Sequence, residues 1–194
     1  MGILADGINE IIATTADPAT GVPNAAPMGI IYRNGRTMMR LFHGTDTEAN
    51  IRVSGWVVAN LTFDPQVYVQ SAFEDLPEEA FMKISAEGSD GIPMQRLSAC
   101  EAWEAFTTTI VSDNPETLVV ELTPVASEIL NLQPHPPNRA FAGIIEATVH
   151  ATRYVVTRDP TLWALIEQAG TVVRKCGGEE CVDALDVLLN YCIK

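Results

Sequence analysis

The sequence has no long hydrophobic run and few of the residues that build metal sites or nucleic-acid surfaces. Even its longest apolar stretches are short, such as residues 56–59, so we expect no segment that spans a bilayer. The 12 Lys and Arg residues form no cluster and the formal net charge is −13, which argues against binding to nucleic acid. The four Cys and three His residues show no paired zinc spacing, so we expect no metal site. We therefore expect a soluble, cytoplasmic protein.

What the chain does have is enough apolar material for a substantial core. It holds 194 residues, of which 47% are hydrophobic. The negative charge is concentrated in residues 61–134, which carry thirteen Asp and Glu against two basic residues. The flanking segments are nearly neutral, so an anionic ligand is more easily accommodated there than in the middle.

The first sixty residues read as closely spaced strands. Residues 8–15, 27–33, 37–43 and 56–62 are rich in β-prone residues, and residues 46–53 read as a short helix ending at Gly55. Asn34-Gly35 between two such runs is a strong signal for a two-residue hairpin. Four strands and one short helix predict a small barrel or a curled sheet.

The remainder is expected to add two strands and then helices. Residues 66–73 read as a helix, 74–94 as a long acidic excursion, and 102–111 and 117–122 as strands. Helices are predicted over 138–152, 160–175 and 179–191, the last two joined at Gly177-Gly178. The expected fold class is α+β with a mainly β core. Residues 1–134 form the core and residues 135–194 a helical part packed on it, including a C-terminal helical hairpin, in one compact unit.

The segment from Asn24 to Met28 contains small side chains followed by a proline. Asn24, Ala25 and Ala26 would let a planar ring lie close to the backbone of a strand. Pro27 removes one donor, so this part of the strand should lie at an edge. The alternative is that the prolines merely shape the entrance of the strand.

A second motif surrounds the start of the predicted helix at residue 46. Thr45 followed by Glu48 fits a capping box, which needs no ligand. The same helix start could instead bind a phosphate through its free N–H groups, with Thr45, Thr47 and Asn50 completing the site. Both interpretations remain open.

The charges around this helix start oppose one another. Asp46 and Glu48 would repel a phosphate unless they point away from it, whereas Arg40 and Arg52 flank the motif and could offset their charge.

A third group of residues shares one side of the helix predicted over 138–152. At about 100° per residue, Arg139, Glu146, His150 and Arg153 form one stripe. Glu146 and His150 are four residues apart and form the one acid–base pair that we can propose as catalytic. The stripe is either a solvated face or the lining of a polar cavity in which Arg139 or Arg153 binds a substrate or anion.

At these motifs the chain resembles a family of archaeal and methylotroph flavoproteins, domain of unknown function 447. The resemblance covers nearly the whole chain and rests on residues 10–15, 23–29, 44–50, Asn60, 138–140, 145–147 and 151–153. It implies the FMN-binding split β-barrel fold with peripheral helices, related to flavin reductases, flavoredoxin and pyridoxamine phosphate oxidases. It also implies FMN as the cofactor and a homodimer with the flavin at the subunit interface.

The resemblance further implies roles for individual residues. The strand from Asn24 to Met28 would face the isoalloxazine, and Asn60 on a later strand would approach the ring. Thr45, Thr47 and Asn50 at the helix start would hold the phosphate. The implied cofactor-binding residues are Asn24, Ala25, Ala26, Pro27, Met28, Gly44, Thr45, Thr47, Asn50 and Asn60.

Three functions are compatible with this sequence. The first is an FMN-dependent oxidoreductase, in which the cofactor carries the electron or hydride transfer and the protein orients it. The second is a non-catalytic flavin-binding or redox-sensing protein. The third is a structural dimer in which the Thr45 motif and the small-residue strand serve only capping and packing.

Overall fold

The computed structural model describes residues 2–87, 91–131 and 133–193. They form two compact units, one of residues 2–62, 76–87 and 91–131 and the other of residues 63–75 and 133–193. The predicted division near residue 134 differs from this one, because residues 63–75 belong with the C-terminal helices.

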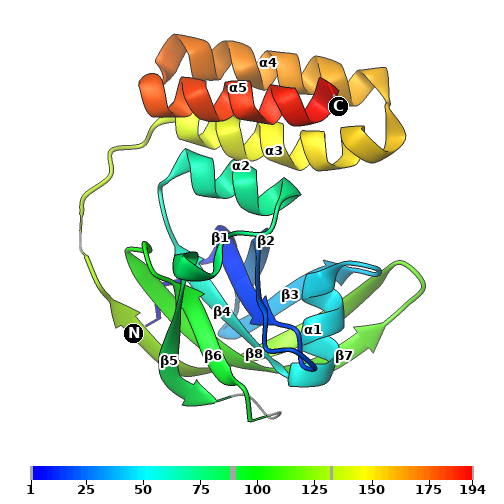
Figure 1. The fold of residues 1–194 in the computed structure, drawn as a ribbon, viewed down its shortest axis with the longest axis vertical. Helices are drawn as coiled ribbons and strands as arrows, with labels where there is room; N and C mark the ends of the chain where they lie inside the picture. The colour runs from blue at the N-terminus through cyan, green and yellow to red at the C-terminus, as the bar shows by residue number, and fades with distance from the viewer. Residues whose placement is uncertain (1, 88–90, 132, 194) are drawn as a thin grey trace. The chain divides into compact units, whose positions relative to one another are not determined.

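The first unit is a six-stranded closed barrel, so the predicted α+β class with a mainly β core is confirmed (Figure 1). The barrel order is β1-β2-β3-β8-β7-β4, and neighbouring strands are antiparallel. The elements of this unit are β1 (Gly7–Ala16), β2 (Pro23–Arg33), β3 (Arg36–Phe42), α1 (Asp46–Ser54), β4 (Trp56–Leu61), the 3-10 turn η1 (Glu78–Ala80), β5 (Phe81–Glu87), β6 (Pro93–Leu97), β7 (Ala102–Asp113) and β8 (Thr117–Ile129).

The barrel encloses a core in which every strand contributes aliphatic or aromatic side chains. Ile11 of β1, Ile30 of β2, Val57 of β4 and Phe106 of β7 are all at most 1% exposed. Ile51 of α1 joins the same cluster, so the short helix is held to the barrel by an apolar anchor. Burial of such side chains is the main stabilising contribution to this unit.

The hairpin between β2 and β3 turns at Asn34 and Gly35, as predicted. Both residues have positive φ, 52° and 74° respectively. Two consecutive residues of that conformation match the twist of antiparallel strands, which is why Asn-Gly is favoured there.

Pro27 lies where, among the described residues, one side of β2 has no neighbouring strand. It is opposite Ile12 of β1, whereas β3 pairs with β2 only from Ile30 to Arg33. The missing N–H of proline is tolerated at such an edge. The expectation that Pro27 occupies an edge position is therefore confirmed.

The prediction of a long excursion over residues 74–94 is wrong. This stretch contains η1 and β5, and β5 pairs with β6 in a separate two-stranded sheet. Residues 88–90, between the two strands, lie outside the described residues. The β6 segment is fixed by distant partners: the Thr14 hydroxyl donates to the Gln95 carbonyl over 2.5 Å, and the Leu97 N–H donates to Asn60 over 2.7 Å.

The second unit is helical. It consists of α2 (Pro65–Phe73), α3 (Arg139–Thr157), α4 (Pro160–Cys176) and α5 (Glu179–Ile193), so the predicted C-terminal hairpin is present (Figure 1). Helix α2 joins this unit through aromatic contacts, with Tyr68 against Phe141 at 5.4 Å and Phe73 against Tyr191 at 4.7 Å between ring centroids. Such contacts couple segments far apart in the sequence, which local patterns do not reveal.

Several elements are longer than their sequence signals indicate. Strand β8 extends to Ile129, and α3 continues to Thr157 before Arg158 adopts a left-handed conformation with φ 53°.

Within the described residues, no helix combines the length and apolar character needed to cross a bilayer. All four cysteines are free.

Candidate functional site

Helix α1 begins at a cap supplied by Thr45. The Thr45 hydroxyl accepts a hydrogen bond from the N–H of Glu48 over 3.3 Å and donates one to the carbonyl of Phe42 over 3.0 Å. Gly44 precedes it with φ +79°, a conformation that favours glycine. The capping interpretation of Thr45 is confirmed.

The cap leaves donors open at the first turn. In the described part of the chain, the backbone N–H groups of Asp46 and Thr47 find no acceptor. Open N–H groups at a helix N-terminus, together with the helix dipole, form a favourable environment for an anion.

Two amide side chains fasten this helix start to the barrel. The Asn24 amide donates to the Thr47 hydroxyl over 3.2 Å, and the Asn50 amide donates to the Thr15 hydroxyl over 3.1 Å. Thr47 and Asn50 are buried, at 3% and 6% exposure. The Thr47 oxygen accepts from Asn24, so its own proton remains available for another acceptor.

The β2 segment beside this helix has the expected small side chains. Ala25 is buried, and Asn24, Ala26, Pro27 and Met28 are half-buried. Because β3 pairs with β2 only from Ile30 onward, the edge of β2 before Ile30 has no strand partner on that side within the part of the chain that the structure describes. The residues predicted to face a ring therefore share a strand segment with an open edge.

Asn60 is completely buried in β4, and its amide is engaged on both sides. The nitrogen donates to the carbonyls of Ile12 and Val58 and to the Thr14 hydroxyl, and the oxygen accepts from Leu97 N–H. Asn60 thus joins β1, β4 and β6. Its approach to a ring stays a prediction.

The Glu48 carboxylate does not complete the capping box. It accepts from the Arg52 guanidinium at 2.6 Å and lies 3.4 Å from His43 Nδ1. Arg52 also pairs with Asp113 at 2.8 Å, and His43 Nε2 lies 2.7 Å from the carbonyl oxygen of Asn114.

These contacts change the protonation equilibria of the cluster. Burial alone would raise the pKa of Glu48, but hydrogen bonds and charge from Arg52 and His43 outweigh it, and the pKa lies below its usual value. The hydrogen bond to Asp113, followed by that to Glu48, raises the pKa of Arg52. The Arg52 guanidinium is paired with Glu48 through Nη2 and with Asp113 through Nη1. Its charge is therefore already balanced by two carboxylates and is not free to bind a phosphate. Arg40 is exposed on β3.

In the helical unit, part of the predicted polar stripe lines a groove of about 320 Å³ between α3 and α4. Arg139, Glu146 and His150 lie along it, whereas Arg153 does not. Glu146 and His150 are 3.8 Å apart, and the buried Nδ1 atom of His150 has no hydrogen-bond partner among the described residues.

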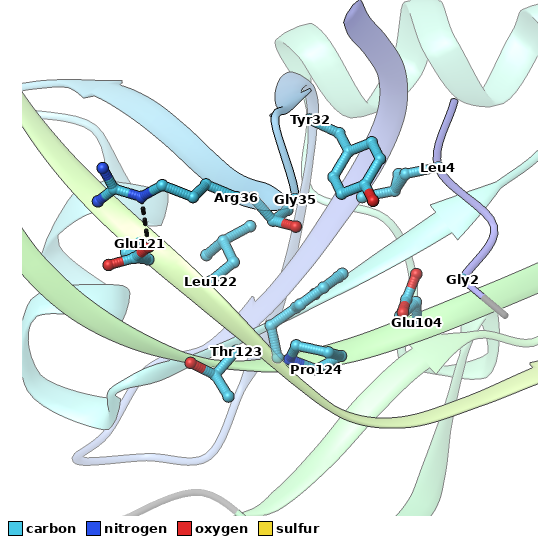
Figure 2. Close-up of a pocket in the computed structure, with 12 residues that line it drawn as sticks. Gly2, Leu4, Tyr32, Gly35, Arg36, Glu104, Glu121, Leu122, Thr123 and Pro124 are labelled. Atoms are coloured by element: carbon cyan, nitrogen blue, oxygen red, sulfur yellow. Dashed lines mark hydrogen bonds and ion pairs between the residues drawn. The ribbon is translucent and has the colours of Figure 1, made fainter. Parts of the chain in front are cut away.

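A second cavity, of about 420 Å³, lies in the barrel unit and was not predicted from the sequence (Figure 2). Figure 2 shows Tyr32 and Glu104 facing it, and Arg36 turned toward Glu121, with which it pairs at 2.9 Å. Glu104 is 6% exposed and accepts from the N–H of Ile3. A single glutamate among the apolar residues at the start of β7 gave no signal of this cavity.

Comparison with known families identifies the chain. The model described as "Protein of unknown function (DUF447) N-terminal domain" matches residues 9–131, and that described as "Protein of unknown function (DUF447)" matches residues 138–190. The chain belongs to the DUF447 family.

Solved structures agree with this assignment. The FMN-bound DUF447 protein MM1853 from Methanosarcina mazei has 31% sequence identity, a TM-score of 0.87, and 96% coverage of each chain. The styrene monooxygenase flavin reductase SMOB from Pseudomonas putida S12 matches at 17% identity and TM-score 0.52, over 66% of this chain and 84% of that one. The 2-nitrobenzoate 2-nitroreductase NbaA from Pseudomonas fluorescens matches at 17% and 0.50, over 66% and 67%.

The more distant likenesses concern the fold alone. They cover about two thirds of this DUF447 chain, whereas MM1853 covers both the barrel and the C-terminal helices. The split-barrel architecture that the sequence predicted for a DUF447 protein is confirmed.

Proposed function

We propose that this DUF447 protein binds FMN, with the phosphate at the first turn of α1 and the isoalloxazine beside the Asn24–Met28 segment of β2. The observation that carries the proposal is the junction of the two motifs. The open N–H groups of Asp46 and Thr47 and the open edge of β2 are joined by the bond from Asn24 to Thr47. MM1853, a family member similar over 96% of the chain, is FMN-bound.

The residues at the helix start have separate tasks in this proposal. Backbone N–H groups and the helix dipole attract the phosphate. The Thr47 hydroxyl contributes a donor, and the Thr45 hydroxyl holds the turn in shape. Asn50 fixes α1 to β1 of the barrel and Asn60 ties β4 to β1, so both position the site.

The proposed activity is an oxidoreductase reaction with an unidentified substrate. Bound FMN supplies electron or hydride transfer, and the chain supplies binding and orientation. Glu146 and His150, 3.8 Å apart, are the proposed acid–base pair, and Arg139 and Arg153 are the proposed substrate or anion contacts.

A non-catalytic flavin-binding or sensing role is the second candidate. It is favoured by the contacts of His43, the histidine beside α1. That residue lies within 3.5 Å of Glu48 and Asp113 and at 2.7 Å from the Asn114 carbonyl oxygen. A histidine held by two carboxylates and a carbonyl is poorly placed to exchange protons with a substrate.

We further infer a homodimer with the flavin at the subunit interface, supported by the resemblance to split-barrel flavoproteins. The four free cysteines fit a reducing compartment such as the cytoplasm.

The test begins with the colour of the purified protein. Flavin absorbance, or saturable quenching of FMN fluorescence on titration, is the expected result. A colourless protein that does not bind added FMN would contradict flavin binding and favour the structural dimer. Reduction of the bound flavin by NADH, NADPH or a reduced deazaflavin would support an oxidoreductase, and failure with all three would support the non-catalytic role.

A further inference from the structure

The cavity of Figure 2 lies inside the end of the barrel at which β2 turns into β3. Tyr32 of β2, Thr37 of β3 and Leu122 of β8 are opposite one another in the strand register and line it. Two positions further into the barrel, Ile30 and Met39 are paired in the same way and are completely buried in the core. Because side chains alternate along a strand, Tyr32 and Thr37 face inward as Ile30 and Met39 do. The mouths of β-barrels are frequent places for small-molecule sites.

Glu104 of β7 also points into this cavity. It is opposite Ala59 of β4, and both Ala59 and Phe106, two positions along β7, belong to the core cluster. Glu104 therefore shares the inward face of its strand with Phe106. The residue is 6% exposed, and its one hydrogen bond within the described part of the chain is accepted from the N–H of Ile3 over 3.2 Å. A carboxylate can accept about four hydrogen bonds, so most of this capacity is unused.

The other two charges around the cavity balance each other. Arg36 and Glu121 pair at 2.9 Å, and the hydrogen bond and charge of Arg36 lower the pKa of Glu121. Among the described residues that line the cavity, Arg36 is the only cation. Glu104 thus leaves one negative charge that no lining residue compensates, at a position withdrawn from solvent. Because a buried carboxylate is costly without a cationic partner, this cavity favours a cation.

The remaining polar atoms of the lining match an ammonium group. In the part of the chain that the structure describes, the hydroxyls of Tyr32 and Thr37 have no hydrogen-bond partner, so their oxygens are available as acceptors. A primary ammonium has three donors and no acceptor, and can therefore bond both hydroxyls and the Glu104 carboxylate. Leu4 and Phe106 add apolar surface that suits the hydrocarbon part of such a molecule.

We propose that the cavity lined by Tyr32, Thr37, Glu104 and Leu122 binds a small organic cation, a protonated primary amine with an apolar body. A volume of about 420 Å³ accommodates such a molecule. The site is separate from the proposed flavin site, because Tyr32 lies four positions, or about 13 Å of strand, beyond Met28. The proposal therefore does not depend on FMN.

Benzylamine is the probe, because it is cationic at neutral pH and joins an ammonium group to an apolar ring. Benzyl alcohol has nearly the same shape without the charge. In NMR titrations that follow the backbone amides of the full chain, benzylamine should saturably shift the signals of Tyr32, Thr37 and Glu104. Benzyl alcohol should bind at least about tenfold more weakly. Excess FMN should leave the affinity for benzylamine unchanged, whether or not FMN itself binds. This comparison uses the unmodified chain, so it does not depend on the folding of a variant.

Glu104→Gln tests the charge itself. The glutamine oxygen can still accept from the N–H of Ile3, so the contact with the N-terminal segment is kept. The variant should raise the dissociation constant for benzylamine at least about tenfold and should bind the amine and the alcohol equally. Glu116→Gln removes an exposed carboxylate outside the cavity, and this matched control should bind benzylamine as the unmodified chain does.

Several results would overturn the proposed amine site. They are the absence of saturable benzylamine binding, shifts confined to residues outside the cavity, displacement of benzylamine by FMN, and equal affinity for benzyl alcohol in the unmodified chain. Undiminished benzylamine affinity in Glu104→Gln would also overturn it, and would leave Glu104 only as an anchor for the N-terminal segment.

Discussion

The side-chain amide of Asn24 donates a hydrogen bond to the hydroxyl of Thr47 across 3.2 Å. This contact joins the small-residue segment of β2 to the N-terminus of α1. Two motifs that are separated by 23 positions in the sequence thereby become one site.

Replacing Thr47 with Val should weaken FMN binding. The substitution preserves shape but removes the hydroxyl, so it deletes a donor to the phosphate and leaves the Asn24 amide without its acceptor. We expect the dissociation constant to rise at least about tenfold, or about 1.4 kcal/mol, in a fluorescence titration. The matched control is Thr109→Val, an exposed threonine on β7, which should bind FMN as the unmodified protein does. Equal affinity of the two variants would remove Thr47 from the site.

Thr45 should show a different signature, because its hydroxyl caps α1. Thr45→Val should lower the free energy of unfolding by about 1 kcal/mol even without FMN, whereas Thr45→Ser should retain most of it. Urea denaturation of the flavin-free protein measures this difference. If both variants unfold at the same urea concentration, the cap contributes nothing.

Asn60→Ala should destabilise the barrel unit. The Leu97 N–H would lose its acceptor at 2.7 Å in a completely buried position, and contacts to β1 would also be lost. A buried unsatisfied donor costs about 1–3 kcal/mol. Urea denaturation should show this loss, and Asn131→Ala, at an exposed position after β8, should have a smaller effect. A loss of flavin affinity with unchanged stability would instead indicate direct contact with the ring.

Local signals in the sequence predicted the elements that depend on neighbours in the chain. The Asn34-Gly35 turn, the Thr45 cap and the start of α4 at Pro160 each involve residues within a few positions of one another. Their geometry is set by backbone conformation and capping, which short motifs encode.

The features that were missed depend on residues far apart in the sequence. The attachment of β6 to the barrel relies on the hydrogen bonds from the Thr14 hydroxyl to the Gln95 carbonyl and from the Leu97 N–H to the Asn60 side chain. Arg52 was expected to offset a phosphate's acidic neighbours, but Asp113, 61 positions away, helps to hold it. The two site motifs were predicted separately, and only the folded chain shows that they touch.

The ion pairs of Glu48 should make stability depend on pH. The folded pKa of Glu48 lies below its ordinary value of 4.5, because Arg52 and His43 outweigh the effect of burial. Its contribution is therefore present above pH 4.5 and is lost as the pH falls through the lowered pKa. Glu48→Gln should cost about 1–2 kcal/mol at pH 7 and progressively less on acidification, as measured by urea denaturation at several pH values. Glu116→Gln, at an exposed glutamate, serves as the control, and a Glu48→Gln deficit that persists unchanged at low pH would contradict the ion-pair account.

Gly177 and Gly178, at the turn between α4 and α5, should respond oppositely to alanine. A Cβ at Gly177 would lie 2.8 Å from the Val173 carbonyl oxygen, 2.9 Å from Cys181 Cβ and 3.0 Å from Ala140 Cβ. Its backbone is extended, with φ −88°, so the cost of Gly177→Ala is steric and should be about 1–3 kcal/mol.

A Cβ at Gly178 would meet nothing within 4 Å, so Gly178→Ala should be neutral within about 0.5 kcal/mol or slightly stabilising. Thermal denaturation followed by far-UV circular dichroism distinguishes the two variants. If both melt together, the close approach of α3 and α5 at this turn does not limit stability. If only Gly177→Ala melts early, the glycine is required for that approach, because both positions lie between the helices and alanine at either one removes the same backbone freedom from the unfolded chain.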